Sequence, residues 1–159
     1  AEPARALRDV RPPHRLESPL LRADPPPGLR PDFEGRLYDA RSVSARAACA
    51  PEPDHLHFQT VVPMWDTTPR RQRDGTIFLN ASPAVFRASL RDCFMRARTM
   101  LPPGQRFVFV NAWNEWAEGA YLEPDIVHGR AYLEAAMEAR HLPADGERIV
   151  DVVARLMRG

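Results

Sequence analysis

Two short apolar runs on either side of one long amphipathic segment constrain this chain more than any other feature. The runs, Phe58–Val62 and Phe107–Val110, are rich in β-branched and aromatic residues, and both are predicted to be strands. No polar residue alternates with the apolar ones in the second run, which predicts a strand that is buried on both faces.

The segment between the runs predicts a core-facing helix of about five turns over residues 83–101. Ser82 is a favoured N-cap, Pro83 is a favoured first helical residue, and a Pro-Pro-Gly sequence ends the segment. The apolar residues at helical spacing are Phe86, Leu90, Cys93, Phe94, Ala97 and Leu101. Because consecutive βα units form parallel strands with right-handed crossovers, this order indicates an α/β fold.

The rest of the chain predicts shorter elements and one irregular region. A helix that begins at Ser42 is expected over Ser42–Cys49. Two more are expected over residues 129–141 and 146–158. Residues 1–34 hold many of the 17 prolines and are expected to form a Pro/Arg-rich linker or an irregular loop, with a proline-rich peptide ligand as the alternative. Residues 143–159 are expected to be a C-terminal helical segment.

Polar and aromatic side chains crowd together directly after the second run. A strand end that mixes carboxylates with tryptophans fits a ligand site better than a plain loop, because each group is costly to leave unpartnered or exposed. Sugars need this mixture, since their hydroxyls bind carboxylates and amides while their C–H faces pack on indole rings. The candidate substrate-binding residues are Asn111, Trp113, Asn114, Trp116, Tyr121 and Glu123, and Asp125 ends the stretch.

Glu115 and Glu118 are the candidate catalytic residues. Their spacing of three places the two Cβ atoms about 5–6 Å apart on a helical turn. Retaining glycosidases hold their two carboxyl groups roughly 5–5.5 Å apart. The spacing permits acid/base chemistry, but a solvated helix face has the same spacing.

Trp65 and Asp66 follow the first predicted strand as Trp113 and Glu115 follow the second. Ligands bind at the carboxyl ends of parallel strands, so both loops are expected to reach one pocket. Asp66 is therefore a candidate substrate-binding residue, with an Asx-turn bonded to Thr67 or Thr68 as the alternative. Arg70 and Arg71 are candidates for binding an anionic group, with solvated loop charges as the alternative.

Four sequence blocks resemble the WbsX family of bacterial polysaccharide-biosynthesis proteins, which is related to glycoside hydrolase family 99. The main block runs from Asn111 to Pro124 and reads NAWNEWAEGAYLEP. The others are PMWDTTPRR at 63–71, GTIFLN at 75–80 and GRAYLE at 129–134, and together they cover about residues 35–140.

The resemblance implies a fold. Relatives in glycoside hydrolase family 99 use a (β/α)8 barrel of the TIM type, which needs about 250 residues. At 159 residues the chain is expected to supply only the C-terminal βα units, within residues 35–142, and to be a piece of a longer protein.

The resemblance also implies an activity. The expected function is action on glycosidic bonds, by transfer or by hydrolysis, in the biosynthesis of bacterial surface polysaccharide or lipopolysaccharide O-antigen. By similarity to endo-mannosidases of family 99, Glu115 is the base for a sugar 2-hydroxyl and Glu118 is the acid/base for the leaving oxygen. The surrounding WNEWAEG sequence is that of WbsX, so transfer and hydrolysis both stay open. The alternatives are a carbohydrate-binding protein without turnover and an inactive fragment.

Charge and composition limit the kinds of partner and ligand that are expected. The net charge of +1 comes from 22 basic residues, all of them Arg, and 21 acidic ones, which provides no field for nucleic acid or an anionic membrane. No run of 18 apolar residues is present, so no integral membrane segment is expected. His55 and His57 lack a third ligand, so no metal and no cofactor are expected. The two cysteines, Cys49 and Cys93, are too few for a disulfide framework, and Cys93, on the apolar face of a predicted helix, is expected to be a reduced structural thiol in a cytoplasmic protein.

Overall fold

The computed structural model describes residues 24–141 and 148–156. The predicted linker therefore lies largely outside the described residues, as do the ends of the predicted C-terminal helix. The strands are β1 Arg36–Asp39, β2 Gln59–Val61, β3 Thr76–Leu79, β4 Val108–Val110, β5 Asn114–Glu115 and β6 Ala120–Tyr121. The α-helices are α1 Ala40–Ala48, α2 Thr68–Arg71, α3 Pro83–Met100, α4 Ala131–His141 and α5 Ile149–Leu156. Short 3-10 turns are η3 Gln72–Asp74, η4 Pro103–Gln105 and η5 Trp116–Glu118.

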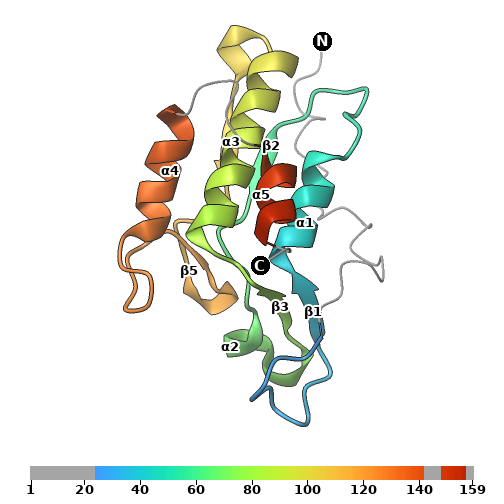
Figure 1. Cartoon of the computed structure of the whole chain (residues 1–159), viewed down its shortest axis with the longest axis vertical. Coiled ribbons are helices and arrows are strands. Elements are labelled where there is room, and N and C mark those ends of the chain that lie inside the picture. Colours follow the sequence, from blue (N-terminus) through green and yellow to red (C-terminus); the bar gives the residue numbers. More distant parts are fainter. Residues whose placement is uncertain (1–23, 142–147, 157–159) are drawn as a thin grey trace.

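The central prediction is confirmed, since β2 and β4 are neighbouring parallel strands with α3 packed across them. Val61 pairs with Val110, and the backbone N–H of Asn111 extends the pairing to the carbonyl of Val61 at 2.9 Å. Val61 joins Phe86 and Leu90 of α3 and Tyr132 of α4 in one buried cluster. Figure 1 shows α4, α3, α5 and α1 side by side, with β2 behind α3.

The prediction that the second strand is buried on both faces is wrong. Val108 and Val110 pack against the buried cluster, but Phe107 and Phe109 are 56% and 55% exposed. The helices pack on the face of the β2–β4 pair that carries Val108 and Val110. The rings of Phe107 and Phe109 instead each lie about 6 Å from the ring of Phe58. An aromatic residue at every second position reads as a continuous apolar run, so the sequence hid the alternation.

Helix boundaries follow the capping residues. Ser82 accepts a hydrogen bond from the backbone N–H of Val85, which confirms the predicted start of α3. The first helix begins at Ala40 instead of Ser42, because Asp39 caps it by accepting from the backbone N–H of Arg41 at 2.8 Å and of Ser42 at 3.4 Å. Aspartate is as good an N-cap as serine, so the earlier residue takes the role.

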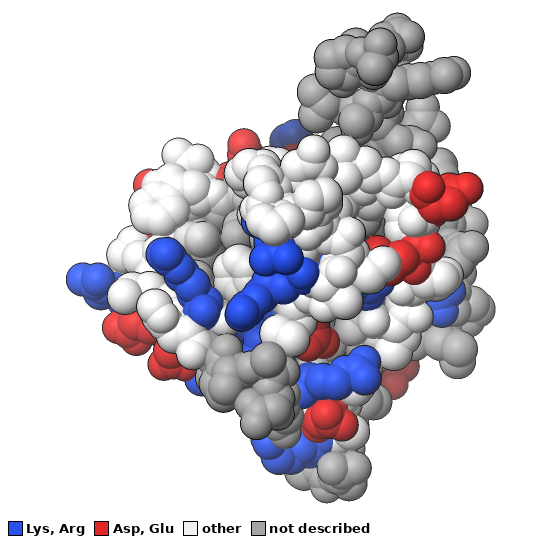
Figure 2. Space-filling model, turned by 90° about the horizontal axis from the view of Figure 1, so that it is seen from above, with Lys and Arg blue, Asp and Glu red and all other residues white. Residues whose placement is uncertain are grey.

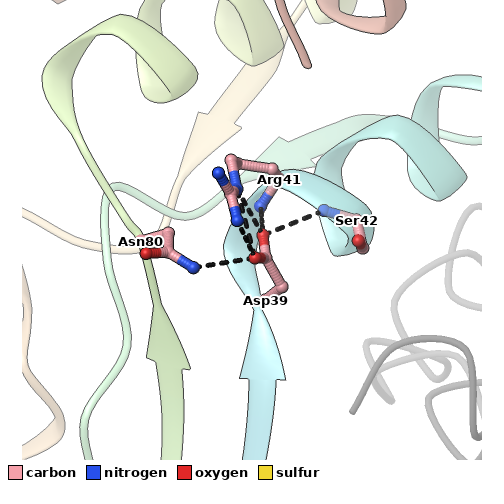
Figure 3. Close-up of polar contacts among 4 residues, drawn as sticks. All are labelled: Asp39, Arg41, Ser42 and Asn80. Atoms are coloured by element: carbon pink, nitrogen blue, oxygen red, sulfur yellow. Dashed lines mark hydrogen bonds and ion pairs between the residues drawn. The ribbon is translucent and has the colours of Figure 1, made fainter. Parts of the chain in front are cut away.

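Four strands escaped the sequence analysis: β1, β3 and the two strands of the β5–β6 hairpin. β1 and β3 pair in parallel, from Arg36 with Thr76 to Asp39 with Leu79. At their carboxyl ends Asn80 donates from its side chain to Asp39 at 2.7 Å, and the guanidinium of Arg41 donates to the same carboxylate at 2.9 Å (Figure 3). Asp39 therefore joins the end of one strand, the start of a helix and the loop after the neighbouring strand.

The segment of residues 65–67 lies between β3 and the hairpin formed by β5, η5 and β6. On one side the backbone N–H of Phe78 donates to the carbonyl of Trp65 at 2.8 Å. On the other side the backbone N–H of Asp66 donates to the carbonyl of Glu118 at 2.8 Å. At the hairpin tip Gly119 has a φ of 57°, and a Cβ there would lie 2.8 Å from the nitrogen and 3.0 Å from the oxygen of the Asp66 backbone. The hairpin packs this closely only because glycine occupies that position.

The two cysteines differ in environment. Cys93 of α3 packs against the buried cluster, and burial together with the nearby Asp92 carboxylate raises the pKa of its thiol to about 12. Cys49 is the C-cap of α1 and is exposed. Arg96 lies in α3, one turn after Cys93. Its guanidinium donates to the carbonyls of Ala47, Ala48 and Ala50 at 2.8–3.0 Å and fixes the end of α1 to α3.

We predict that Asp39→Ala lowers the free energy of unfolding by about 1–2 kcal/mol, the usual cost of losing an N-cap. Burial alone would raise the pKa of Asp39, but the hydrogen bonds from Arg41 and Asn80 outweigh it and hold that pKa below its usual value. Because the folded pKa is the lower one, the stabilisation is present above the unfolded value of about 3.9 and is lost as pH falls through the folded pKa.

Urea unfolding of the parent and of Asp39→Asn at neutral and acidic pH measures how much the Asp39 carboxylate contributes to the free energy of unfolding. The difference between them should be largest near pH 7 and should shrink below about pH 4. Asp54→Asn is the control, because Asp54 is fully exposed. Parallel stability curves for the parent and Asp39→Asn at every pH would contradict the role of the carboxylate.

We predict that Gly119→Ala separates the hairpin from residues 65–67. Alanine in the left-handed conformation costs about 1–2 kcal/mol, and its Cβ would also clash with the backbone of Asp66. The measurement is hydrogen exchange at the amide of Asp66, which should become faster. Gly104→Ala is the matched control, because a Cβ at Gly104 meets nothing within 4 Å. Unchanged protection at Asp66 would show that the hairpin does not depend on this glycine.

Candidate functional site

A cleft of about 480 Å³ lies where residues 64–69, the end of β3, the hairpin and the start of α4 meet. It includes four of the predicted site residues, Trp65, Asp66, Trp116 and Tyr121. The remaining lining residues are Met64, Pro69, Ile77, Phe78, Leu79, Asn80, Ala81, Gly119, His128 and Tyr132. The loops after β2 and β3 both reach it, so residues from two strand ends share one cleft.

Aromatic rings form a rigid surface on the hairpin side of the cleft. The indole of Trp116 stacks on the ring of Tyr121, with centroids 3.8 Å apart and planes 17° from parallel. Its Nε1 donates to Oε2 of Glu123 at 2.6 Å, which fixes the orientation of the indole. Because Trp116 stays 46% exposed, it offers an apolar face to a ligand while its polar edge is already bonded.

The two candidate catalytic glutamates occupy different environments. Glu118 lies in η5, and its carboxylate pairs with the guanidinium of Arg70 while its side chain is only 20% exposed. Glu115 lies in β5, where it pairs with Ala120 and is exposed. A ligand that reaches Glu118 must therefore compete with Arg70, whereas Glu115 is open to solvent.

Asp66 combines the two roles that the sequence left open. Its Oδ1 accepts from the backbone N–H of Thr68 at 2.8 Å, which is the expected Asx-turn. The same residue also lines the cleft. The turn therefore holds the carboxylate at the cleft wall.

Four predicted substrate-binding residues shape the hairpin without lining the cleft. Asn111 is half-buried and extends the β2–β4 pairing, and the carbonyl of Trp113 accepts from the backbone N–H of Leu122 at 2.9 Å. Asn114 is exposed and pairs with Tyr121 in the hairpin. The fourth is Glu123, whose carboxylate accepts the hydrogen bond from the indole of Trp116. Trp113 is 54% exposed.

The sequence analysis missed His128, Tyr132 and Asn80 as cleft residues. Oδ2 of Asp125 lies 3.1 Å from Nδ1 of His128, and Tyr132 is 3% exposed. Asn80 directly follows an apolar run, which is the same strand-end signal that identified Trp65. No sequence signal pointed to His128 or Tyr132, because the loop after Asp125 and the turn into α4 bring them to the cleft.

The described residues show no group of three or more His, Cys, Asp or Glu side chains that could hold a metal ion. His55 and His57 are both exposed, with their rings 6.5 Å apart.

The surface carries charges of both signs. In Figure 2 the basic and acidic side chains lie among each other on a largely uncharged face. Within the described parts of the chain, no helix has the length and apolar character needed to cross a membrane.

Known proteins match much of the chain. The profile of the family described as glycosyltransferase WbsX matches residues 7–136. Two Xanthomonas campestris pv. campestris proteins, both called uncharacterized protein WxcX, from strain B100 and strain ATCC 33913, are each 41% identical over 111 residues. The match covers 70% of this chain but only 16% of each relative. No solved structure matches the chain.

The family profile spans most of the chain and includes β2, α3, β4, the hairpin and the cleft residues between them. The chain therefore belongs to the WbsX glycosyltransferase family.

Proposed function

We propose that this chain carries part of the active site of an enzyme that acts on glycosidic bonds during the assembly of bacterial surface polysaccharide, by glycosyl transfer or by hydrolysis. The observation that carries the proposal is the cleft beside the hairpin, where the stacked Trp116 and Tyr121 lie next to Asp66. Stacked rings pack on the C–H face of a sugar while carboxylates bind its hydroxyls. Membership of a glycosyltransferase family supports the same class of ligand.

We further propose that the parallel pairs β1–β3 and β2–β4 belong to the C-terminal βα units of a (β/α)8 barrel. The parallel β2–β4 pair with α3 in the connection supports this assignment. The loops after β2 and β3 both line the cleft, and barrel enzymes bind their substrates among the loops at the carboxyl ends of the strands.

In the proposed reaction Glu115 and Glu118 share the proton transfers. Glu115 removes the proton of the sugar 2-hydroxyl, whose oxygen attacks the anomeric carbon. The glycosidic C–O bond breaks, and the carboxyl proton of Glu118 passes to the leaving oxygen. In the second step Glu118 takes the proton of water or of an acceptor hydroxyl as that oxygen attacks the anomeric carbon. The bond between the anomeric carbon and the 2-oxygen breaks, and Glu115 returns its proton to the 2-oxygen.

The geometry supports a division of labour between the glutamates. Glu115 is exposed, so a ligand can reach it directly. Glu118 lies against Arg70, and its own backbone carbonyl is bonded to Asp66 in the cleft wall. Neither glutamate is among the residues that line the cleft, so a substrate seated there must extend along the hairpin and displace Arg70 to meet Glu118.

A carbohydrate-binding protein without turnover is the second candidate. The observation that favours it is the aromatic platform, which depends on Glu123 and Tyr121 for its orientation and not on Glu115 or Glu118. Such a protein would use the glutamates only as hydrogen-bond acceptors.

We predict that Glu115→Gln and Glu118→Gln each lower the turnover of a glycan panel by about 10²–10⁴-fold in the natural protein, while saccharide affinity stays close to that of the parent. Glutamine keeps the shape and an acceptor but cannot exchange a proton. The losses should not add in the double variant, because the two residues act as a unit. Glu134→Gln, on the exposed face of α4, is the control.

The leaving group separates the two roles. Glu118→Gln should spare substrates with very good leaving groups, and Glu115→Gln should not, because only the former loses leaving-group protonation. Equal losses on all leaving groups would contradict the assignment. Saccharide binding without any turnover by the parent protein would favour the non-catalytic candidate.

A further inference from the structure

Asp125 and His128 form a fixed pair beside the cleft. Oδ1 of Asp125 accepts from the backbone N–H groups of Val127 and His128, both at 2.6 Å. Its Oδ2 lies 3.1 Å from Nδ1 of His128, and the two side chains are 7% and 31% exposed. Backbone hydrogen bonds in both directions between Asp125 and Gly129 close the loop that carries the pair.

The hydrogen-bond acceptor in the Asp125–His128 pair is the ionised carboxylate of Asp125. Burial alone would raise the pKa of Asp125, but the hydrogen bonds from the backbone and the ring of His128 outweigh it and lower that pKa. A carboxylate facing Nδ1 assigns the proton of the neutral imidazole to that nitrogen. The second nitrogen, Nε2, then keeps its lone pair, and the described residues give it no hydrogen-bond partner.

Tyr132 supplies a second polar group at the same place. Its ring lies edge-on to His128 with centroids 5.2 Å apart, and both residues line the cleft. The residue is 3% exposed, and its hydroxyl has no hydrogen-bond partner among the described residues. Buried hydroxyl groups are nearly always bonded, so an unpaired one on a cleft wall points to a bound group as its partner.

The charges around the cleft restrict what binds there. No Arg is among its lining residues, and Asp66 is the one carboxylate among them. Arg70 lies nearby but is paired with Glu118. An anionic sugar would therefore meet the Asp66 carboxylate, and among the lining residues the one basic group is the imidazole of His128, whose Nδ1 already faces Asp125.

We propose that His128 and Tyr132 bind the hydroxyl groups of an uncharged pyranose seated against Trp116 and Tyr121, with Asp125 as the positioning residue. The proposal rests on the proposed function and goes further, because it names two binding residues and the charge class of the sugar at this subsite. Nε2 of His128 accepts from one sugar hydroxyl, and the hydroxyl of Tyr132 donates to a sugar oxygen.

The test is a saccharide titration of the natural protein followed by NMR of ¹⁵N-labelled imidazoles. The probes are the methyl glycosides of glucose, mannose and galactose, together with glucuronic acid as the charged comparison. The free protein should show His128 as the Nδ1–H tautomer, and a neutral glycoside should shift its Nε2 resonance. Asp125→Ala should give a mixture of both tautomers and weaker binding.

Two conservative variants test the contacts. His128→Phe and Tyr132→Phe keep the ring volumes, and each should weaken binding of the neutral glycoside roughly threefold to tenfold, the effect of one neutral hydrogen bond. Tyr132→Phe should also leave the melting temperature unchanged or higher, because it removes a buried unpaired hydroxyl, and a purely structural tyrosine would not lose binding in this way. His141→Phe, at the exposed end of the same helix, is the control.

The outcomes separate this inference from the proposed function. A parent protein that turns over the glycan panel but binds none of these saccharides overturns the inference alone, and one that neither binds nor turns over any glycan overturns both. A parent that binds a neutral glycoside, with both Phe variants equally tight, overturns the inference and leaves the proposed function standing. Tighter binding of glucuronic acid than of any neutral glycoside overturns the charge class.

Discussion

The cleft depends on one close approach between two backbones, that of Gly119 at the hairpin tip and that of Asp66 in the segment after β2. The amide of Asp66 donates to the hairpin, and the neighbouring carbonyl of Trp65 accepts from β3 on the other side. Residues 65–67 therefore hold the hairpin and the β1–β3 pair in a fixed relation. Any side chain at position 119 would push these backbones apart and open the wall that Trp65, Trp116 and Tyr121 share.

This arrangement places the functional groups on short elements supported by hydrogen bonds and not on long flexible loops. Trp116 is fixed by stacking and by Glu123, Asp66 by its own turn, and His128 by Asp125. Glu118 is also fixed, but by Arg70, which occupies the acceptor that a substrate would use. For the proposed reaction the aromatic surface is already oriented, whereas Glu118 must first release Arg70.

The sequence predicted those features that depend on local chemistry or on regular spacing. The parallel β2–β4 pair, α3 and its Ser82 cap followed from apolar runs and capping residues, and Trp65 and Asp66 were placed in the cleft from their position after a strand. It did not predict the β1–β3 pair, because β1 reads Arg-Leu-Tyr-Asp and carries only two apolar residues between charged ones, so no apolar run marks it. Nor could it find His128 and Tyr132, which reach the cleft through the fold of the loop before α4. The exposed face of β4 was missed because spacing alone does not show which face a helix covers.

The difference between the two cysteines has a practical consequence. A thiol with a pKa of about 12 is almost wholly protonated at neutral pH, and the protonated form is a poor nucleophile, so Cys93 will resist maleimides and iodoacetamide. Cys49 stands exposed at the end of α1, next to the carbonyls that Arg96 holds. The described fold thus has one site for selective alkylation without any substitution, and a fluorophore or spin label attached there would report on the contact between α1 and α3 during unfolding.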